Sequence, residues 1–195
     1  MAIIRNKIHG VGIVGEGKYS AGAGTKNIHT KQYTTWYSML RRCYDEKEHK
    51  INPCYKECKV CDEWLNLQVF GEWFDKNYIE GYQLDKDLLV KGNKIYSPET
   101  CCFIPQEINL LLVNRKRSRG KYPIGVSKDK TKMSAHIVIK AKQYYLGNYN
   151  TAEEAFNAYK KAKEFNIISI AEEYKDRISS EVYNTLLNYT ININD

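Results

Sequence analysis

The spacing of the cysteines raises the question of a structural metal site. Two residues separate Cys58 from Cys61, which is the spacing of a zinc half-site. Cys101 and Cys102 are direct neighbours, so in a strand their side chains would point to opposite faces. Because a second pair with metal-ligand spacing is missing, we expect free, reduced thiols rather than zinc at Cys58 and Cys61.

The basic residues form a second chemically informative group. Residues 115–142 contain ten Lys and Arg and one acid, Asp129, a net charge of +9 that leaves −2 for the rest of this +7 chain. Such a concentrated positive stretch is typical of phosphate binding, although a solvated basic linker is the alternative. The side chains predicted to contact DNA are Arg115, Arg117, Arg119, Lys128, Lys130, Lys132, Lys140 and Lys142.

Length and composition indicate an ordinary soluble protein. The chain has 195 residues, 43% of them hydrophobic, which suits one or two small domains. It contains no long apolar run and begins without a signal-peptide core. We therefore expect a cytoplasmic location and no membrane partner.

The glycine-rich beginning of the chain does not predict a nucleotide site. Residues 10–15 match the spacing of the dinucleotide-binding fingerprint, but no strand, turn and helix surround them. We expect residues 1–31 to form an irregular N-terminal arm.

Hydrophobic periodicity places the elements between residues 32 and 113. Apolar residues at helical spacing predict one helix from Gln32 and another capped by Asn66. The polar segment 46–56 is predicted to be a loop because it contains Asn52-Pro53. Residues 84–90 and 96–104 are predicted strands, and a helix is expected over 106–112.

The C-terminal part has a different pattern. Three short segments within residues 122–149 alternate apolar and polar side chains, as strands of a half-buried sheet do. Thr151 and Glu154 then form a capping box at the start of a helix. One face of that helix collects small and aromatic residues that can lie against a sheet: Ala152, Ala155, Phe156, Tyr159 and Ala162. Further helical segments are predicted over 167–175 and 180–189.

This C-terminal pattern resembles the plant ethylene-response-factor (Apetala-two) type DNA-binding domain, which also occurs in phage and bacterial homing endonucleases. The resemblance implies a sheet that enters the major groove of DNA. Ile124 and Ser127 stand where plant members carry Arg, and Met133 where they carry Trp, so no base specificity is carried over. The matching residues are Gly125, Val126, Ala135, Ile137, Leu146, Gly147, Thr151 to Ala155, Ala158 and Tyr159.

The preceding part resembles the HNH-like proteins of phages, which combine two strands and a helix. The resemblance is carried by residues 84–87, by the Tyr-Ser-Pro-Glu-Thr-Cys segment 96–101 and by Asn109. Earlier matches are Trp36, Met39, Arg42, Cys43, Val60, Cys61, Glu63 and Trp64.

In an active HNH site a strand histidine acts as general base, and acidic or Asn side chains hold a divalent metal. Lys86 stands at the histidine position, and no histidine occurs between His49 and His136. A lysine with an ordinary pKa of about 10.4 is protonated at neutral pH and is a poor base. The resemblance still implies Mg²⁺ or another divalent ion at Asp85, Asp87 and Asn93, with Asp85, Asp87 and Asn109 catalytic if the site is active.

The sequence therefore predicts an α+β protein with a helical plus ββα (HNH-like) module over residues 32–113. A basic linker over 114–121 leads to a three-stranded antiparallel sheet packed on a helix within 122–195. The expected function is binding of double-stranded DNA by a phage or mobile-element protein on a degenerate nuclease scaffold. The alternatives are an active metal-dependent homing endonuclease, or an inhibitor that binds a host or defence protein acting on nucleic acid.

Overall fold

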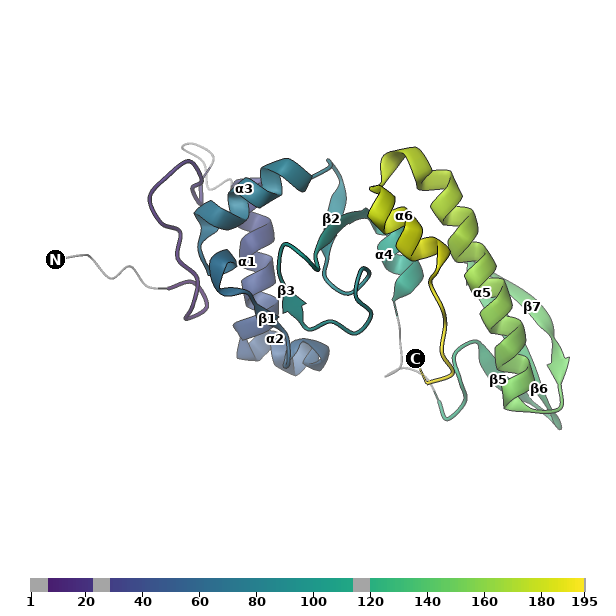
Figure 1. The fold of residues 1–195 in the computed structure, drawn as a ribbon. Helices are drawn as coiled ribbons and strands as arrows, with labels where there is room; N and C mark the ends of the chain where they lie inside the picture. Colours follow the sequence, from purple (N-terminus) through teal and green to yellow (C-terminus); the bar gives the residue numbers. More distant parts are fainter. Residues whose placement is uncertain (1–6, 23–28, 114–119, 195) are drawn as a thin grey trace. The chain divides into compact units, whose positions relative to one another are not determined.

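In the computed structural model the chain is a mixed α+β protein divided into two compact units, Met1–Gln106 and Glu107–Asp195 (Figure 1). The structure describes residues 7–22, 29–113 and 120–194. Across these residues, no helix combines the length and apolar character needed to cross a membrane.

The N-terminal unit combines helices with short strands. Its helices are α1 (Lys31–Tyr44), α2 (Glu46–Ile51) and α3 (Leu67–Asn77), with 3-10 turns at Pro53–Tyr55 and Asp62–Leu65. Strand β1 (Lys59–Val60) pairs in parallel with β3 (Ile95–Tyr96), and β2 (Tyr82–Asp85) pairs antiparallel with β4 (Cys102–Pro105). Helix α4 (Gln106–Leu112) follows β4 directly and, from Glu107 onward, belongs to the C-terminal unit.

Aromatic side chains of α1, of α3 and of the 3-10 turn Asp62–Leu65 contribute to the core of this unit. Trp36 and Trp64 are fully buried, and the indole of Trp36 donates a 2.6 Å hydrogen bond to the carbonyl oxygen of Trp64. The described part of the predicted arm packs onto this core: Tyr19 is 8% exposed. Gly12 lies so close to Trp36 that a Cβ there would come within 2.8 Å of the ring. Close packing of the backbone against Trp36 accounts for this glycine.

Two predictions for the N-terminal unit were wrong in detail. The expected loop 46–56 contains α2, because the Asp45 carboxylate caps this short helix through the backbone N–H of Glu48. The expected strand 84–90 already ends at Asp85, and the expected strand 96–104 is divided between β3 and β4. The helices predicted from Gln32 and after Asn66 are confirmed by α1 and α3.

The C-terminal unit contains the predicted three-stranded antiparallel sheet. Strands β5 (Val126–Asp129), β6 (Lys132–Ile139) and β7 (Lys142–Tyr149) pair in the order β5-β6-β7. Helix α5 (Ala152–Tyr174) follows, with the capping box of Thr151 and Glu154 formed as predicted. A 3-10 turn (Lys175–Arg177) and α6 (Ser180–Leu187) complete the unit.

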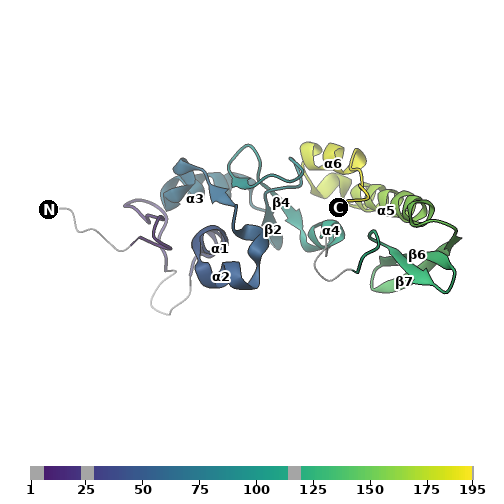
Figure 2. The ribbon, with the colours of Figure 1, turned by 90° about the horizontal axis from the view of Figure 1, so that it is seen from below.

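Helix α5 covers one face of this sheet (Figures 1 and 2). Ala135 and Ile137 of β6 are buried, as are Ala155 and Tyr159 of α5. Gly125 has a φ of +76°, and a Cβ there would lie 2.0 Å from the ring of Tyr159. The small residues therefore let the helix axis approach the sheet closely.

Candidate nucleic-acid interface

The register of the sheet determines which side chains lie opposite α5. Neighbouring residues of a strand point to opposite faces, and in β6 Ala135 and Ile137 point toward the helix. His136 and Val138 therefore point away from it. Following the pairings of β6 with β5 and β7 gives an open face made of Ser127, Asp129, Lys132, Ser134, His136, Val138, Gln143, Tyr145 and Asn148, of which Ser134 is itself buried, at 4% exposed.

The centre of this open face is polar and aromatic rather than charged. Tyr145 is 59% exposed, and its ring centroid lies 5.6 Å from that of His136 on the neighbouring strand. Ser134 donates a hydrogen bond to the side-chain oxygen of Asn148. Amide, imidazole and phenol groups can donate and accept hydrogen bonds, so this surface is equipped to contact base edges.

The predicted lysines lie around the open face rather than in its centre. Lys130 and Lys140 occupy the two hairpin turns, each with a positive φ, 49° and 47°. By the register only Lys132 points to the open face, whereas Lys128 and Lys142 are exposed on the opposite side at the sheet margins. The Lys140 ammonium is 3.7 Å from the Glu173 carboxylate, a solvent-exposed pair that a phosphate could replace.

The predicted contacts Arg115, Arg117 and Arg119 lie outside the described residues.

A β-bulge explains why the sequence pattern missed the open-face residues of β7. Gly147 lies opposite Ala135, but Tyr145 lies opposite His136, so Leu146 is an extra residue in the strand. Plain alternation counted back from Tyr149 would place Tyr145 on the helix side. The bulge reverses this and presents Tyr145 on the open face.

The residues Asp85, Asp87 and Asn93 of the predicted metal site lie in a turn after β2, in which Asp85 and Asn93 form hydrogen bonds with backbone groups of the same segment. The carboxylate of Asp85 accepts backbone N–H bonds from Asp87 (2.9 Å) and Leu88 (2.7 Å). The Asn93 amide donates to the backbone carbonyls of Lys86 and Ile95, both at 2.6 Å. Burial, together with the nearby charge of Asp87, raises the pKa of Asp85. Asn109 lies on α4, in the second compact unit.

Lys86 occupies the middle of this turn. It is 6% exposed, and its ammonium donates to a carboxylate oxygen of Asp87 at 2.8 Å and to the backbone carbonyl of Asn93 at 3.0 Å. Burial lowers the pKa of Lys86, but the hydrogen bond and charge of Asp87 outweigh it and raise the pKa overall. The ammonium thus contacts oxygen atoms of the kind that a divalent cation would use.

The cysteines are free thiols in this structure. Burial raises the pKa of both Cys43 and Cys101 to about 12, so both are protonated at neutral pH. In the described ranges no three Cys, His, Asp or Glu side chains come together as a metal ion requires. The expectation that Cys58 and Cys61 do not bind zinc, and that of a divalent ion at Asp85, Asp87 and Asn93, both stay predictions.

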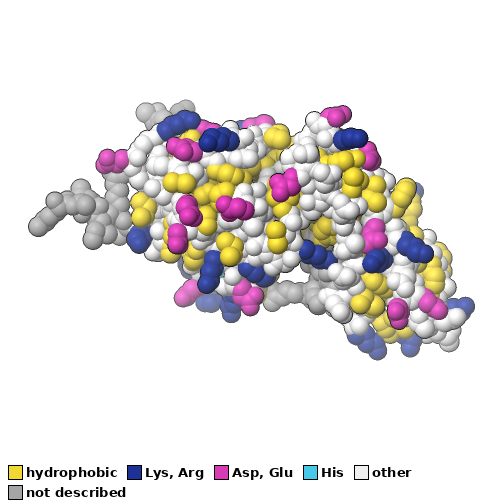
Figure 3. All heavy atoms as spheres, in the orientation of Figure 1, with side chains coloured by type: hydrophobic (Ala, Val, Ile, Leu, Met, Phe, Trp, Pro, Cys, Tyr) yellow, Lys and Arg dark blue, Asp and Glu magenta, His cyan; other side chains and the backbone are white. Residues whose placement is uncertain are grey.

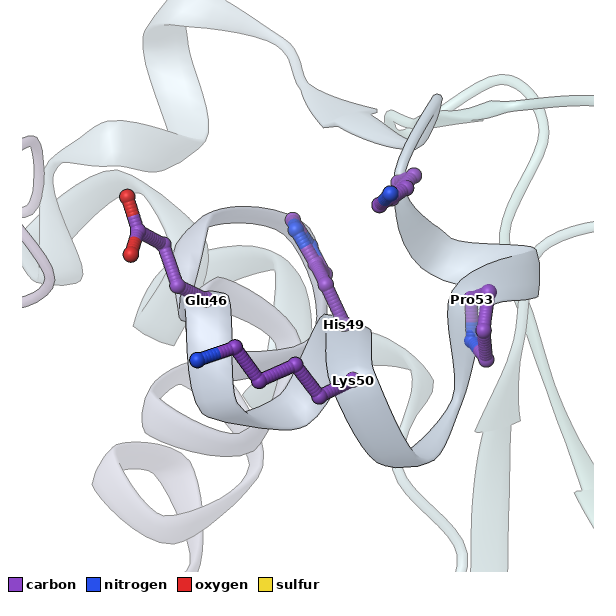
Figure 4. A pocket seen from close by; sticks show the side chains of 5 residues that line it. Glu46, His49, Lys50 and Pro53 are labelled. Atoms are coloured by element: carbon purple, nitrogen blue, oxygen red, sulfur yellow. The ribbon is translucent and has the colours of Figure 1, made fainter.

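A separate surface hollow of about 520 Å³ lies beside α2 (Figure 4). Its lining combines one acidic residue with basic residues. The imidazole nitrogen of His49 lies 2.9 Å from the backbone carbonyl oxygen of Arg42. The lining residues are Glu46, His49, Lys50, Pro53 and Lys56. None of the residues with predicted catalytic roles contributes to it.

Comparison with known proteins found no matching family model, curated protein or solved structure.

Proposed function

We propose that the C-terminal unit binds double-stranded DNA through the open face of its sheet. The observation that carries this proposal is the polar, aromatic centre of the open face, opposite α5, with Lys132 on the same face and Lys130 and Lys140 in the hairpin turns. Base edges would meet the centre, and phosphates would meet the surrounding ammonium groups.

The dimensions of the sheet favour the major groove. Neighbouring strands are about 4.8 Å apart, so three strands span roughly 10 Å between the outer backbones. The major groove is about 12 Å wide and the minor groove about 6 Å. The sheet matches the wider groove, in keeping with the Apetala-two resemblance of residues 122–163.

The polar centre can provide moderate sequence preference. Gln143 and Asn148 carry amides, which pair well with adenine in the major groove. Tyr145 offers a large apolar ring beside His136, suited to a thymine methyl group or the sugar edge. Lys130 and Lys140, in the turns at opposite ends of β6, would neutralise phosphates at two places along the groove.

The test is binding of a fluorescent duplex to the full chain, followed by anisotropy over a series of salt concentrations. Wild type should bind more weakly as salt rises. Lys130→Glu with Lys132→Glu should reduce affinity at least about tenfold and lower the salt slope by roughly two units, about 0.9 per lost phosphate contact. Tyr145→Ala should weaken binding with little change of that slope.

A matched control is Lys47→Glu with Lys76→Glu, which makes the same charge change on exposed helix positions of the N-terminal unit. This control should keep both affinity and slope close to wild type. Absence of duplex binding at low salt would overturn the proposal and favour a protein partner. Equal losses in both double variants would indicate unspecific attraction to net charge.

A further inference from the structure

Within the C-terminal unit, the described residues leave a stripe on the second half of α5 exposed. Phe165 is 73% exposed and Ile168 is 39% exposed. Lys161 and Glu172 lie on the same side of the helix at its two ends, both exposed. At 3.6 residues per turn these four side chains fall within about 60° of one another around the helix axis. We call Lys161, Phe165, Ile168 and Glu172 the α5 stripe.

Most of α5 is covered elsewhere. Ala155, Phe156 and Tyr159, in its first half, are buried against the sheet. In its second half Ile167, Ile170 and Ala171 are buried where α6 packs. Apolar and charged side chains stand next to each other on the surface over α5 and α6 (Figure 3). The stripe is thus a distinct side of the helix, and it leaves the open face of the sheet free.

The order of residues along the stripe is self-complementary. The midpoint between Phe165 and Ile168 is also the midpoint between Lys161 and Glu172. A twofold axis through this point would set Phe165 against Ile168 of a second copy, and Lys161 against Glu172 of that copy. A parallel arrangement would instead place like charges together. We propose that the α5 stripe is a contact between two antiparallel copies of this chain.

The charged ends of the stripe support a second copy as the occupant. Glu172 lies in the last turn of α5, where the negative end of the helix dipole disfavours a carboxylate, and no basic residue accompanies it there. Its neighbour Glu173 is paired with Lys140, whereas Glu172 accepts a hydrogen bond from the Tyr183 hydroxyl. In the described part of the chain neither Lys161 nor Glu172 forms an ion pair. Each would gain an opposite charge from the second copy.

The contact is small, so association should be reversible and depend on concentration. Analytical ultracentrifugation of the full chain without DNA should show the weight-average mass rising from 22.7 kDa toward twice that value as concentration increases. Phe165→Ala with Ile168→Ala should raise the dissociation constant at least about tenfold. Both side chains are exposed in the single chain, so the thermal midpoint at low concentration should stay unchanged.

Charge reversal tests the antiparallel geometry itself. Lys161→Glu alone, or Glu172→Lys alone, should weaken association, because each places like charges at both ends of the contact. The two substitutions together in one chain should restore it. An equimolar mixture of the two single variants should also associate, because the contact between unlike chains pairs opposite charges at both ends. Glu181→Lys on the exposed surface of α6 is the control and should behave as wild type.

A chain that stays monomeric at every attainable concentration would overturn the proposal. So would association that persists in the Phe165→Ala, Ile168→Ala double variant. If that variant instead lowers the thermal midpoint of a monomer, the stripe is covered within its own chain, and the proposal fails. All of these measurements are made without DNA, so their outcome is separate from that of the DNA-binding test.

Discussion

At the scale of single residues, Lys86 determines the character of the predicted metal site. Its ammonium lies between the Asp87 carboxylate and the Asn93 carbonyl, and the Asn93 amide returns to the Lys86 carbonyl. A buried ammonium with two oxygen acceptors is a stable arrangement because it satisfies polar groups that would otherwise be orphaned. Lys86, the residue that stands at the expected histidine position, therefore stabilises the turn through its hydrogen bonds.

We expect Lys86→Met to lower the free energy of unfolding by about 1–3 kcal/mol, since the Asn93 carbonyl loses a partner while the side-chain volume is kept. Exposed Lys94→Met is the control and should change stability little. Urea unfolding measures the free energy of unfolding of both variants.

Folding raises the pKa of Lys86. The contribution of its charge to stability is therefore complete below the ordinary lysine pKa of about 10.4, and it is lost as pH rises through the higher pKa of the folded state. A difference between wild type and Lys86→Met that disappeared at lower pH would contradict this account.

At the scale of elements, the contact of α5 with the sheet depends on the missing Cβ atom of Gly125. Gly125 combines a positive φ with a close approach to Tyr159, so a methyl group would be strained by the backbone and would collide with the ring. The carbonyl of Gly125 also accepts a 2.8 Å bond from the backbone N–H of His136, which fixes the start of β5 against β6. The geometry of the open face therefore depends on this glycine.

Gly125→Ala should destabilise the C-terminal unit by roughly 2–4 kcal/mol, from the strained φ plus the overpacking. Far-UV circular dichroism during thermal unfolding measures the change. Gly120→Ala is the matched control, because a Cβ there meets nothing within 4 Å. Equal stability of the two alanine variants would show that Tyr159 can move aside.

At the scale of the whole molecule, each compact unit has its own core. The N-terminal core is built from aromatic residues around Trp36 and Trp64, and the C-terminal core from smaller side chains between α5, α6 and the sheet. The three tryptophans, Trp36, Trp64 and Trp73, all belong to the N-terminal unit. Tryptophan fluorescence is therefore a reporter of one unit in the intact chain.

With this reporter, Lys86→Met should lower the urea midpoint seen by tryptophan fluorescence. Gly125→Ala should leave that midpoint within error of wild type while it lowers the midpoint seen by circular dichroism. The physical reason is that each substitution perturbs one core only. A lowered fluorescence midpoint in Gly125→Ala would instead show that the chain unfolds as a single cooperative unit.

The sequence by itself determined the elements with strong local signals. The helical spacing around Trp36, the Asn66 cap and the Thr151–Glu154 capping box each specify a helix through neighbouring residues, and all three helices are present. The alternation of apolar and polar residues likewise predicted the antiparallel sheet of β5, β6 and β7. The short helix α2 escaped prediction because Asn52-Pro53 suggested a loop, while Asp45 supplied a cap just before the segment.

Only the tertiary structure decided which side chains share a surface. The extra residue Leu146 reverses which side chains of β7 face the helix, so Tyr145 lies beside His136 on the open face. The alternation of apolar and polar residues in the sequence could not show this. The burial of Lys86 depends on Asn93, seven residues away, and the exposure of Phe165 depends on where the sheet and α6 end along α5. Local propensity acts over a few residues, whereas pairing register and burial are set by contacts between distant segments of the chain.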